Sequence, residues 1–178
     1  AGYAEKIGGW QKFASNSYLG TARALHPFVA LDKSRYVGVG TNKKYYLHLG
    51  GDFIDITPIR LTTAAGDATF AASNGSSTIT VTETGHQAVA GDFVTFSGAA
   101  TLGGVITADV LNQEYEIQSI VGVNSYTIIA RTAGTTIQGI TDDGAINRTP
   151  VTANSSDTGN GGSSVIATYQ INTGLDTS

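Results

Sequence analysis

The chain has 178 residues and a mass of 18.3 kDa, with a hydrophobic fraction of 40% and a charged fraction of 13%; this fits one packed domain or two small ones and argues against general disorder. The absence of cysteine excludes disulfide frameworks, thiolate zinc sites and cysteine nucleophiles. No apolar run approaches the length needed to cross a bilayer, so we expect no membrane insertion.

The net charge of −4 is unevenly distributed along the chain. Residues 1–60 hold eight basic residues against four acidic ones, whereas residues 61–178 hold only Arg131 and Arg148 against ten acidic ones. The local balance is therefore about +4 and about −8, which indicates two units with different surroundings. The basic residues of the first part are scattered, whereas a nucleic-acid groove needs a dense basic stripe with exposed aromatic residues.

Residues 1–60 are predicted to form a meander of short antiparallel strands. Asp32–Arg35 is a polar turn inside the first hairpin, and Gly50–Gly51 supplies the positive φ values that the second tight hairpin requires. The four strands are expected at residues 28–31, 36–41, 44–49 and 53–57. The chain contains no methionine, so it either begins at Ala1 after processing or is the ordered piece of a longer polypeptide. The second is favoured, because Glu5 leads directly into Gly8, Gly9 and Trp10.

Residues 61–132 are predicted to form a separate small β domain. Strict alternation places Ile79 and Val81 on one face of a strand, and Val94 and Phe96 on one face of the next. Further strands are expected at residues 114–120 and 125–130. Several short strands spaced by Gly, Asn and Asp turns imply a small antiparallel barrel or sandwich.

Residues 133–178 lose this pattern. Residues 154–164 read as a polar, glycine-rich loop that cannot bury enough surface to order itself. Residues 165–171 read as one closing strand, which needs a partner; the natural partners are the first unit, to which it would return, or the remainder of a longer chain.

The three histidines, His26, His48 and His86, have no metal-ligand spacing. His48 shares a strand face with Tyr46 and is expected to be partly buried and hydrogen-bonded, and His86 at a turn is expected to satisfy a loop carbonyl. The serines lie in turns without the G-x-S-x-G elbow of a hydrolase. We therefore predict no catalytic, cofactor-binding or metal-ligating residue, no cofactor and no enzyme activity.

Two acidic pairs are candidates for functional sites. Asp142–Asp143 before Gly144 could be a fragment of a calcium loop, but the D-x-D-x-D-G spacing with a distal Glu is absent, which favours an ordinary turn. Glu114 and Glu116 share one strand face and are expected to mark the solvated side of the small β domain.

Aromatic residues of the first unit could form a sugar-binding platform. The candidates are Trp10, Tyr36, Tyr45 and Tyr46. Because they sit inside alternating strand patterns, a role in the core is the better interpretation.

Three stretches resemble the opening of a large family of bacteriophage tail proteins. These are Glu5–Trp10 (EKIGGW), Gly40–Thr41 followed by Tyr45–Leu49, and Asp55–Arg60 (DITPIR). Likewise, Thr80–Gly98 (TVTETGHQAVAGDFVTFSG) and Tyr126–Ala130 (YTIIA) are similar to small β domains inserted in phage structural proteins. The resemblance implies a β-sheet or β-propeller-like platform that carries an inserted β domain. Proteins of this family are much longer than this chain, which would be one piece of one of them.

The resemblance implies a non-enzymatic virion protein: a ring-forming homo-oligomer in a phage tail nozzle, hub or adaptor, made in the host cytoplasm. Its partners would be other tail proteins, double-stranded DNA passing without sequence recognition, and the host surface. If the acidic second part lined the channel, its charge would repel the DNA backbone. Two alternatives remain open, a glycan-binding adhesin and an enzyme acting on cell-wall polymer, and the enzyme would need a carboxylate pair facing a groove.

Overall fold

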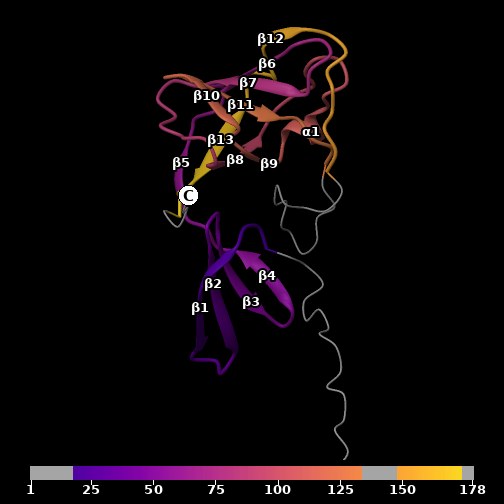
Figure 1. The fold of residues 1–178 in the computed structure, drawn as a ribbon. Helices are drawn as coiled ribbons and strands as arrows, with labels where there is room; N and C mark the ends of the chain where they lie inside the picture. Colours follow the sequence, from indigo (N-terminus) through magenta and orange to yellow (C-terminus); the bar gives the residue numbers. More distant parts are fainter. Residues whose placement is uncertain (1–17, 134–147, 174–178) are drawn as a thin grey trace, which may run out of the picture.

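The computed structural model describes residues 18–133 and 148–173, whose strands assemble into three antiparallel sheets (Figure 1). In this part of the chain there are thirteen strands and one helix of four residues, α1 (Ala108–Leu111). The all-β, antiparallel fold class expected from the sequence is confirmed. No helix in these two ranges is long and apolar enough to cross a membrane.

The first sheet is a four-stranded meander that contains both predicted hairpins. Its strands, in spatial order, are β1 (Ala22–Val29), β2 (Arg35–Thr41), β3 (Tyr45–Leu49) and β4 (Asp52–Asp55). The two turns suit their residues, since Gly50 and Gly51 have φ of 62° and 98°, and Asp32 accepts hydrogen bonds from the backbone N–H and the hydroxyl of Ser34. The first strand begins at Ala22, six residues before the predicted start at Phe28.

The other two sheets pack face to face and form a sandwich. One contains β5 (Ile59–Thr62), β13 (Ile166–Gln170), β8 (Phe93–Ser97) and β9 (Glu114–Glu116) in this order. The other contains β10 (Ser119–Gly122), β11 (Ser125–Ile129), β7 (Thr78–Thr82), β6 (Thr69–Ala72) and β12 (Asp157–Asn160).

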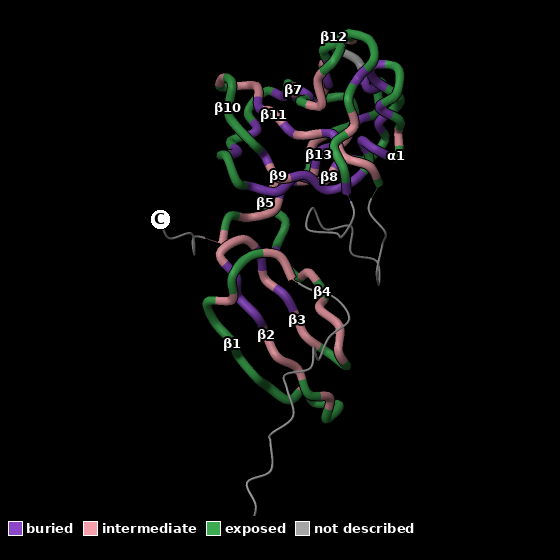
Figure 2. The backbone as a smooth tube through the Cα atoms, turned by 45° about the vertical axis from the view of Figure 1, so that its right-hand side comes forward, coloured by how far each residue is buried: buried purple, intermediate pink, exposed green. Residues whose placement is uncertain are grey.

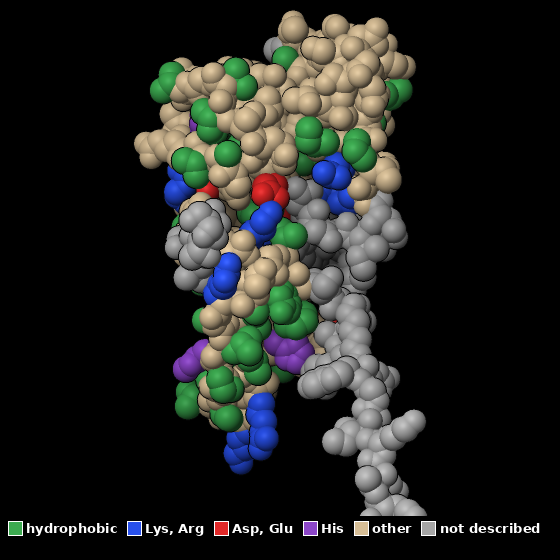
Figure 3. All heavy atoms as spheres, viewed as in Figure 1, with side chains coloured by type: hydrophobic (Ala, Val, Ile, Leu, Met, Phe, Trp, Pro, Cys, Tyr) green, Lys and Arg blue, Asp and Glu red, His purple; other side chains and the backbone are tan. Residues whose placement is uncertain are grey.

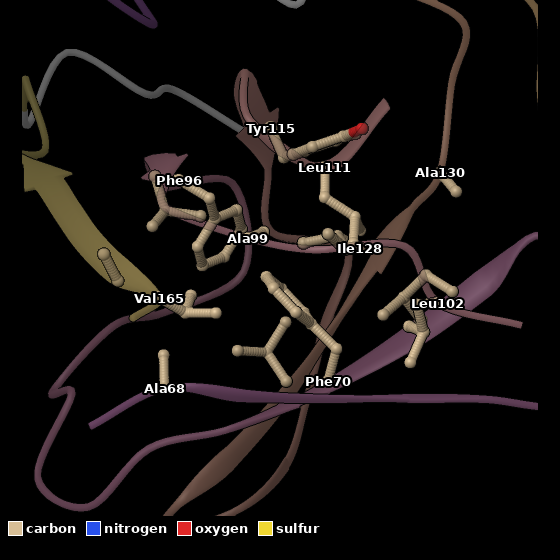
Figure 4. Close-up of a cluster of buried hydrophobic side chains, with 14 of the residues drawn as sticks. Ala68, Phe70, Phe96, Ala99, Leu102, Leu111, Tyr115, Ile128, Ala130 and Val165 are labelled. Atoms are coloured by element: carbon tan, nitrogen blue, oxygen red, sulfur yellow. The ribbon is translucent and has the colours of Figure 1, made fainter. Parts of the chain in front are cut away.

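The main hydrophobic core lies between these two sheets (Figure 4). Phe70 of β6 meets Phe96 of β8 edge to face, with ring centroids 4.9 Å apart. Ile79 and Val81 are fully buried, as the alternation of β7 predicts, and so is Val94. The two packed sheets form a sandwich, so the alternative of a closed barrel is wrong, and they include β12 and β13 from beyond the predicted residues 61–132. The β-propeller-like platform stays a prediction.

The predicted strand at residues 114–120 is wrong in one respect, because it is two strands in different sheets. β9 ends at Glu116 and pairs with β8, whereas β10 begins at Ser119 and pairs with β11. The switch occurs at two adjacent backbone N–H groups: that of Ile117 donates to Asp92 and that of Gln118 to Thr127. Corner strands of this kind, which cross from one sheet to the other, are typical of sandwiches.

The C-terminal part also differs from expectation. The polar loop predicted at residues 154–164 contains β12, which pairs with β6 and so obtains from a neighbouring strand the order that its composition cannot supply. The closing strand β13 was expected to pair with the first unit; it lies instead between β5 and β8, inside the sandwich. Since β5 belongs to the same sheet, the second unit begins near residue 58, slightly before the predicted boundary.

One end of the first sheet lies against one end of the sandwich (Figure 2). The chain enters the sandwich at Pro58 and returns beside the same point, where the N–H of Ile171 donates to the carbonyl of Pro58 at 2.9 Å. The next residues contact the first sheet, since the Thr173 hydroxyl donates to the carbonyl of Asn42 at 3.1 Å and Tyr45 donates to the carbonyl of Thr173 at 3.2 Å. The residues after β13 thus return to the first unit although the strand itself does not.

Candidate functional site

Charged residues gather at the junction between the first sheet and the sandwich. We call Lys43, Lys44, Asp55, Glu114 and Glu116 the junction cluster. The Lys44 ammonium lies 2.7 Å from an oxygen of Asp55 and 2.6 Å from an oxygen of Glu114, and its side chain is fully buried. The Lys43 ammonium contacts both oxygens of Glu116 at 2.8 Å. Two lysines of the first sheet are therefore held by two glutamates of β9.

The loop between β2 and β3 positions the two lysines. The hydroxyl of Thr41 accepts hydrogen bonds from the N–H groups of Lys43 and Lys44 and donates to the Lys44 carbonyl. These three bonds within the turn hold its backbone in place. Beneath it, the Lys44 ammonium sits 4.6 Å from the centre of the Phe93 ring. A cation over an aromatic face is attracted by the ring electrons, and a buried lysine needs such partners.

Asp55 closes the junction cluster from β4. Its carboxylate also accepts hydrogen bonds from the Thr57 N–H at 2.8 Å and from the Gln170 side chain at 3.2 Å. Burial works to raise the pKa of Asp55, but the Lys44 charge and the hydrogen bonds outweigh it and hold the pKa below its usual value. The carboxylate is thus ionised and engaged, which fits a structural joint and leaves no free base.

The junction cluster corrects the prediction that Glu114 and Glu116 mark a solvated side. Glu114 is buried against Lys44, and Glu116 is half-buried against Lys43. The same finding bears on the idea of an acidic channel lining. Glu83 and Asp92 are buried as well, and Asp92 accepts hydrogen bonds from the Val89 N–H and the Asn172 amide. These four acids are therefore not exposed in the way a channel wall requires.

A second polar group lies inside the sandwich, and we call Glu83, Tyr126 and Tyr169 the tyrosine cluster. The two hydroxyls are 2.7 Å apart across the two sheets, and the Tyr169 hydroxyl donates a short hydrogen bond to Glu83. Burial raises the pKa of Glu83, although the hydrogen bond from Tyr169 opposes the rise, and burial raises the pKa of both tyrosines far above 10.

His86 and Arg60 border the tyrosine cluster. The His86 ring lies 5.0 Å from the Tyr126 ring and its Nδ1 accepts a hydrogen bond from the Ala88 N–H at 3.0 Å. Burial lowers the pKa of His86, and a backbone hydrogen bond with Gly122 acts in the opposite direction. The Arg60 guanidinium donates to the carbonyl of His86 and lies 5.4 Å from the Tyr169 ring.

Perturbed carboxyl, tyrosine and histidine groups in one place are a common sign of an active site. Here Glu83, His86, Tyr126 and Tyr169 are each at least 97% buried, so a substrate has no surface on which to meet them. The arrangement satisfies polar groups between two sheets, which is a structural task.

The first sheet exposes apolar side chains on both faces. The strand register places Leu25 and Val29 on one face and Phe28 and Ile54 on the other, and all four are exposed. In Figure 3 hydrophobic side chains cover much of the visible side of this sheet, with basic side chains at its free end. Since only Val39 and Tyr46 are buried apolar residues in these strands, the sheet has far less core than the sandwich.

The aromatic candidates for a sugar platform divide between core and surface. Tyr46 is buried and accepts a hydrogen bond from the Leu19 N–H, while Tyr36 and Tyr45 are half-buried. The Tyr36 ring stacks on Phe28, and Phe28 stacks on His26 with centroids 6.1 Å apart. The ring of Tyr36 is thus packed against a neighbouring aromatic side chain.

The remaining candidates fall as follows. His48 is half-buried and its ring lies 4.9 Å from that of Phe53. Trp10 and Asp142–Gly144 lie outside the described residues. Within residues 18–133 and 148–173, no group of three or more His, Asp or Glu side chains is placed to hold a metal ion.

Comparison with known proteins gives no relative. No family model, no curated protein and no solved structure matches the chain.

Proposed function

We propose that this chain is a self-assembling structural protein, a component of a phage tail whose copies associate through the first sheet. The observation that carries the proposal is the single layer of β1–β4, which leaves apolar side chains exposed on both faces and has no strand at either edge in the described chain. Sheets of this kind are normally paired or covered by a neighbour.

The charged groups support an architectural role more than a chemical one. The junction cluster and the tyrosine cluster both hold sheets together, and their carboxylates are engaged by lysine, tyrosine or backbone groups. The two connections at Pro58 and Ile171 support a sandwich carried on a platform, because both lie at one end of the sandwich. The resemblance of Glu5–Trp10 and Asp55–Arg60 to phage tail proteins supplies the virion setting.

Light scattering coupled to size exclusion, followed by negative-stain electron microscopy, tests this function. We expect oligomers of defined mass with ring-shaped views, and no saturable signal on a glycan array. A monomer at all concentrations that binds a glycan saturably would favour the adhesin and overturn the proposal.

A further inference from the structure

The outer edges of β1 and β4 carry backbone groups that point away from the sheet. The N–H of Ala30 donates to the carbonyl of Ser34, and along an antiparallel edge strand residues that bond inward alternate with residues that face outward. Leu25, Pro27 and Val29 therefore direct their backbone groups away from β2. On the other edge the N–H of Ile56 donates to the carbonyl of Tyr45, so by the same alternation the backbone groups of Phe53 and Asp55 face outward. No strand of the described chain pairs with either edge.

The two edges are geometrically matched for each other. The meander has four antiparallel strands, so β1 and β4 run in opposite directions. A second copy that places its β1 beside β4 therefore continues the same antiparallel alternation. Both hairpin turns, at residues 30–34 and 50–51, lie at the free end of the sheet, away from the sandwich (Figure 1).

Opposite charges are also matched at the free end of these edges. The β1–β2 hairpin carries Arg23, Lys33 and Arg35, and its one acid, Asp32, is engaged by Ser34. The acids of the first sheet's other hairpin, Asp52 and Asp55, are both on β4. In the antiparallel arrangement Lys33 of one copy approaches Asp52 of the next at the free end, whereas Asp55 at the junction end is already held by Lys44.

Pairing like edges is less favourable. Two β1 edges would bring two prolines without N–H groups and two sets of basic residues together, while two β4 edges would oppose aspartates. Pairing β1 with β4 loses one donor, that of Pro27, and gains opposite charges. It also brings Leu25 and Val29, which are 66% and 64% exposed in the single chain, beside the side chains of the neighbouring β4.

We propose that the partner of this surface is a second copy of the chain, whose β1 adds to β4 and extends the first sheet from copy to copy. This inference rests on the proposed self-assembly and names its contact. Because the two surfaces differ, the contact is head-to-tail and closes into a ring when the rotation between copies permits.

Cysteine cross-linking tests the contact in the full chain, which has no native cysteine. Phe28→Cys and Ile54→Cys lie on the same face, on β1 and β4, and are 40% and 43% exposed. Within one chain these strands are three spacings apart, about 14 Å, which exceeds the reach of a disulfide. Under a mild oxidant we expect the double variant to form a ladder of covalent oligomers, with folding checked by circular dichroism.

Single variants identify which edges meet. A mixture of Phe28→Cys and Ile54→Cys chains should give a covalent dimer, while either variant alone should give little. Dimers from either variant alone would show like edges pairing and overturn the head-to-tail contact. Oligomers in solution without any cross-link would overturn the edge contact and leave self-assembly standing, whereas a monomer at all concentrations would overturn both.

Exchanging the charges of Lys33 and Asp52 tests the same contact independently, without cysteines. Asp52→Lys alone and Lys33→Glu alone should each shift the association to at least tenfold higher protein concentration at low salt. The two changes combined should restore most of the association, because the opposite signs are again paired. Equal loss in single and double variants would overturn the role of these charges in the contact.

Discussion

Lys44 is the residue through which the first sheet and the sandwich are most directly joined. Its buried ammonium bridges Asp55, from its own sheet, and Glu114, from β9. Removing one partner of a buried ion pair is costly because the remaining charge stays out of water, whereas an exposed pair contributes little.

The two glutamates of β9 provide a matched test of this difference. Glu114→Gln should lower the free energy of unfolding by about 2 kcal/mol or more, and Glu116→Gln by no more than about 0.5 kcal/mol. The side chain of Glu114 is 6% exposed and that of Glu116 is 27% exposed. Urea denaturation at pH 7 measures both, and equal losses would contradict the buried joint.

Glu83 makes stability depend on pH in the direction opposite to most acidic groups. Its pKa is raised in the folded protein, so the folded state binds the proton more tightly than the unfolded state. The contribution of Glu83 is therefore most favourable below its ordinary value of 4.5 and declines as pH rises from there to the raised pKa.

Glu83→Gln removes this decline and keeps an acceptor for the Tyr169 hydroxyl. We expect the variant to gain stability relative to the wild type between pH 4 and pH 7, on the order of 1 kcal/mol. Urea midpoints across that range measure the difference, and Asp109→Asn, at an exposed acid of α1, serves as the control. A constant difference between Glu83→Gln and wild type would refute the assignment.

Contacts of this kind could not be predicted from the sequence. Lys44 and Glu114 are 70 positions apart, and the alternation of β9 indicates only that Glu114 and Glu116 share a face. That face points to the first sheet, and nothing local in a strand tells whether its polar face meets water or a second unit. The pairing of Tyr126 with Tyr169 across the sandwich is hidden for the same reason.

At the scale of elements, two glycines bracket β8 in different surroundings. Gly91 and Gly98 have φ of 90° and 73°, so either alanine variant meets backbone strain. A Cβ at Gly98 would lie 2.2 Å from the carbonyl oxygen of Ser164, while a Cβ at Gly91 would have no atom within 4 Å.

Gly91→Ala should therefore cost about 1 kcal/mol of stability, and Gly98→Ala at least about 2 kcal/mol more, because the loop before β13 must move. Thermal unfolding followed by circular dichroism measures both. Similar losses in the two variants would mean that the loop at Ser164 yields easily.

Strands with a strong local pattern were predicted from the sequence, and strands that depend on a neighbour were not. Ile79 and Val81 identify β7 because alternation needs one apolar side only. The four residues of β6 and the polar residues of β12 carry weak patterns and are ordered by pairing with each other and with β7. Similarly, the place of β13 between β5 and β8 depends on partners far away in the sequence.

At the scale of the whole molecule, the core of the sandwich contains no residue of the first sheet. A fragment of residues 58–173 should therefore fold and unfold cooperatively by itself, with circular dichroism and urea denaturation as the measurements. Its stability should fall short of the full chain because Glu114 loses Lys44. A fragment without a cooperative transition would show that the sandwich depends on the first sheet.

The neighbouring connections at Pro58 and Ile171 have an evolutionary consequence. A module that starts and stops at one spot can be deleted, or exchanged for another, by a single genetic event that leaves the four-stranded sheet intact. Only the charged residues of the first sheet that contact the sandwich, chiefly Lys43, Lys44 and Asp55, would need to be substituted to suit a different module. Diversity among related proteins should then concentrate above the sheet, with the platform keeping its form.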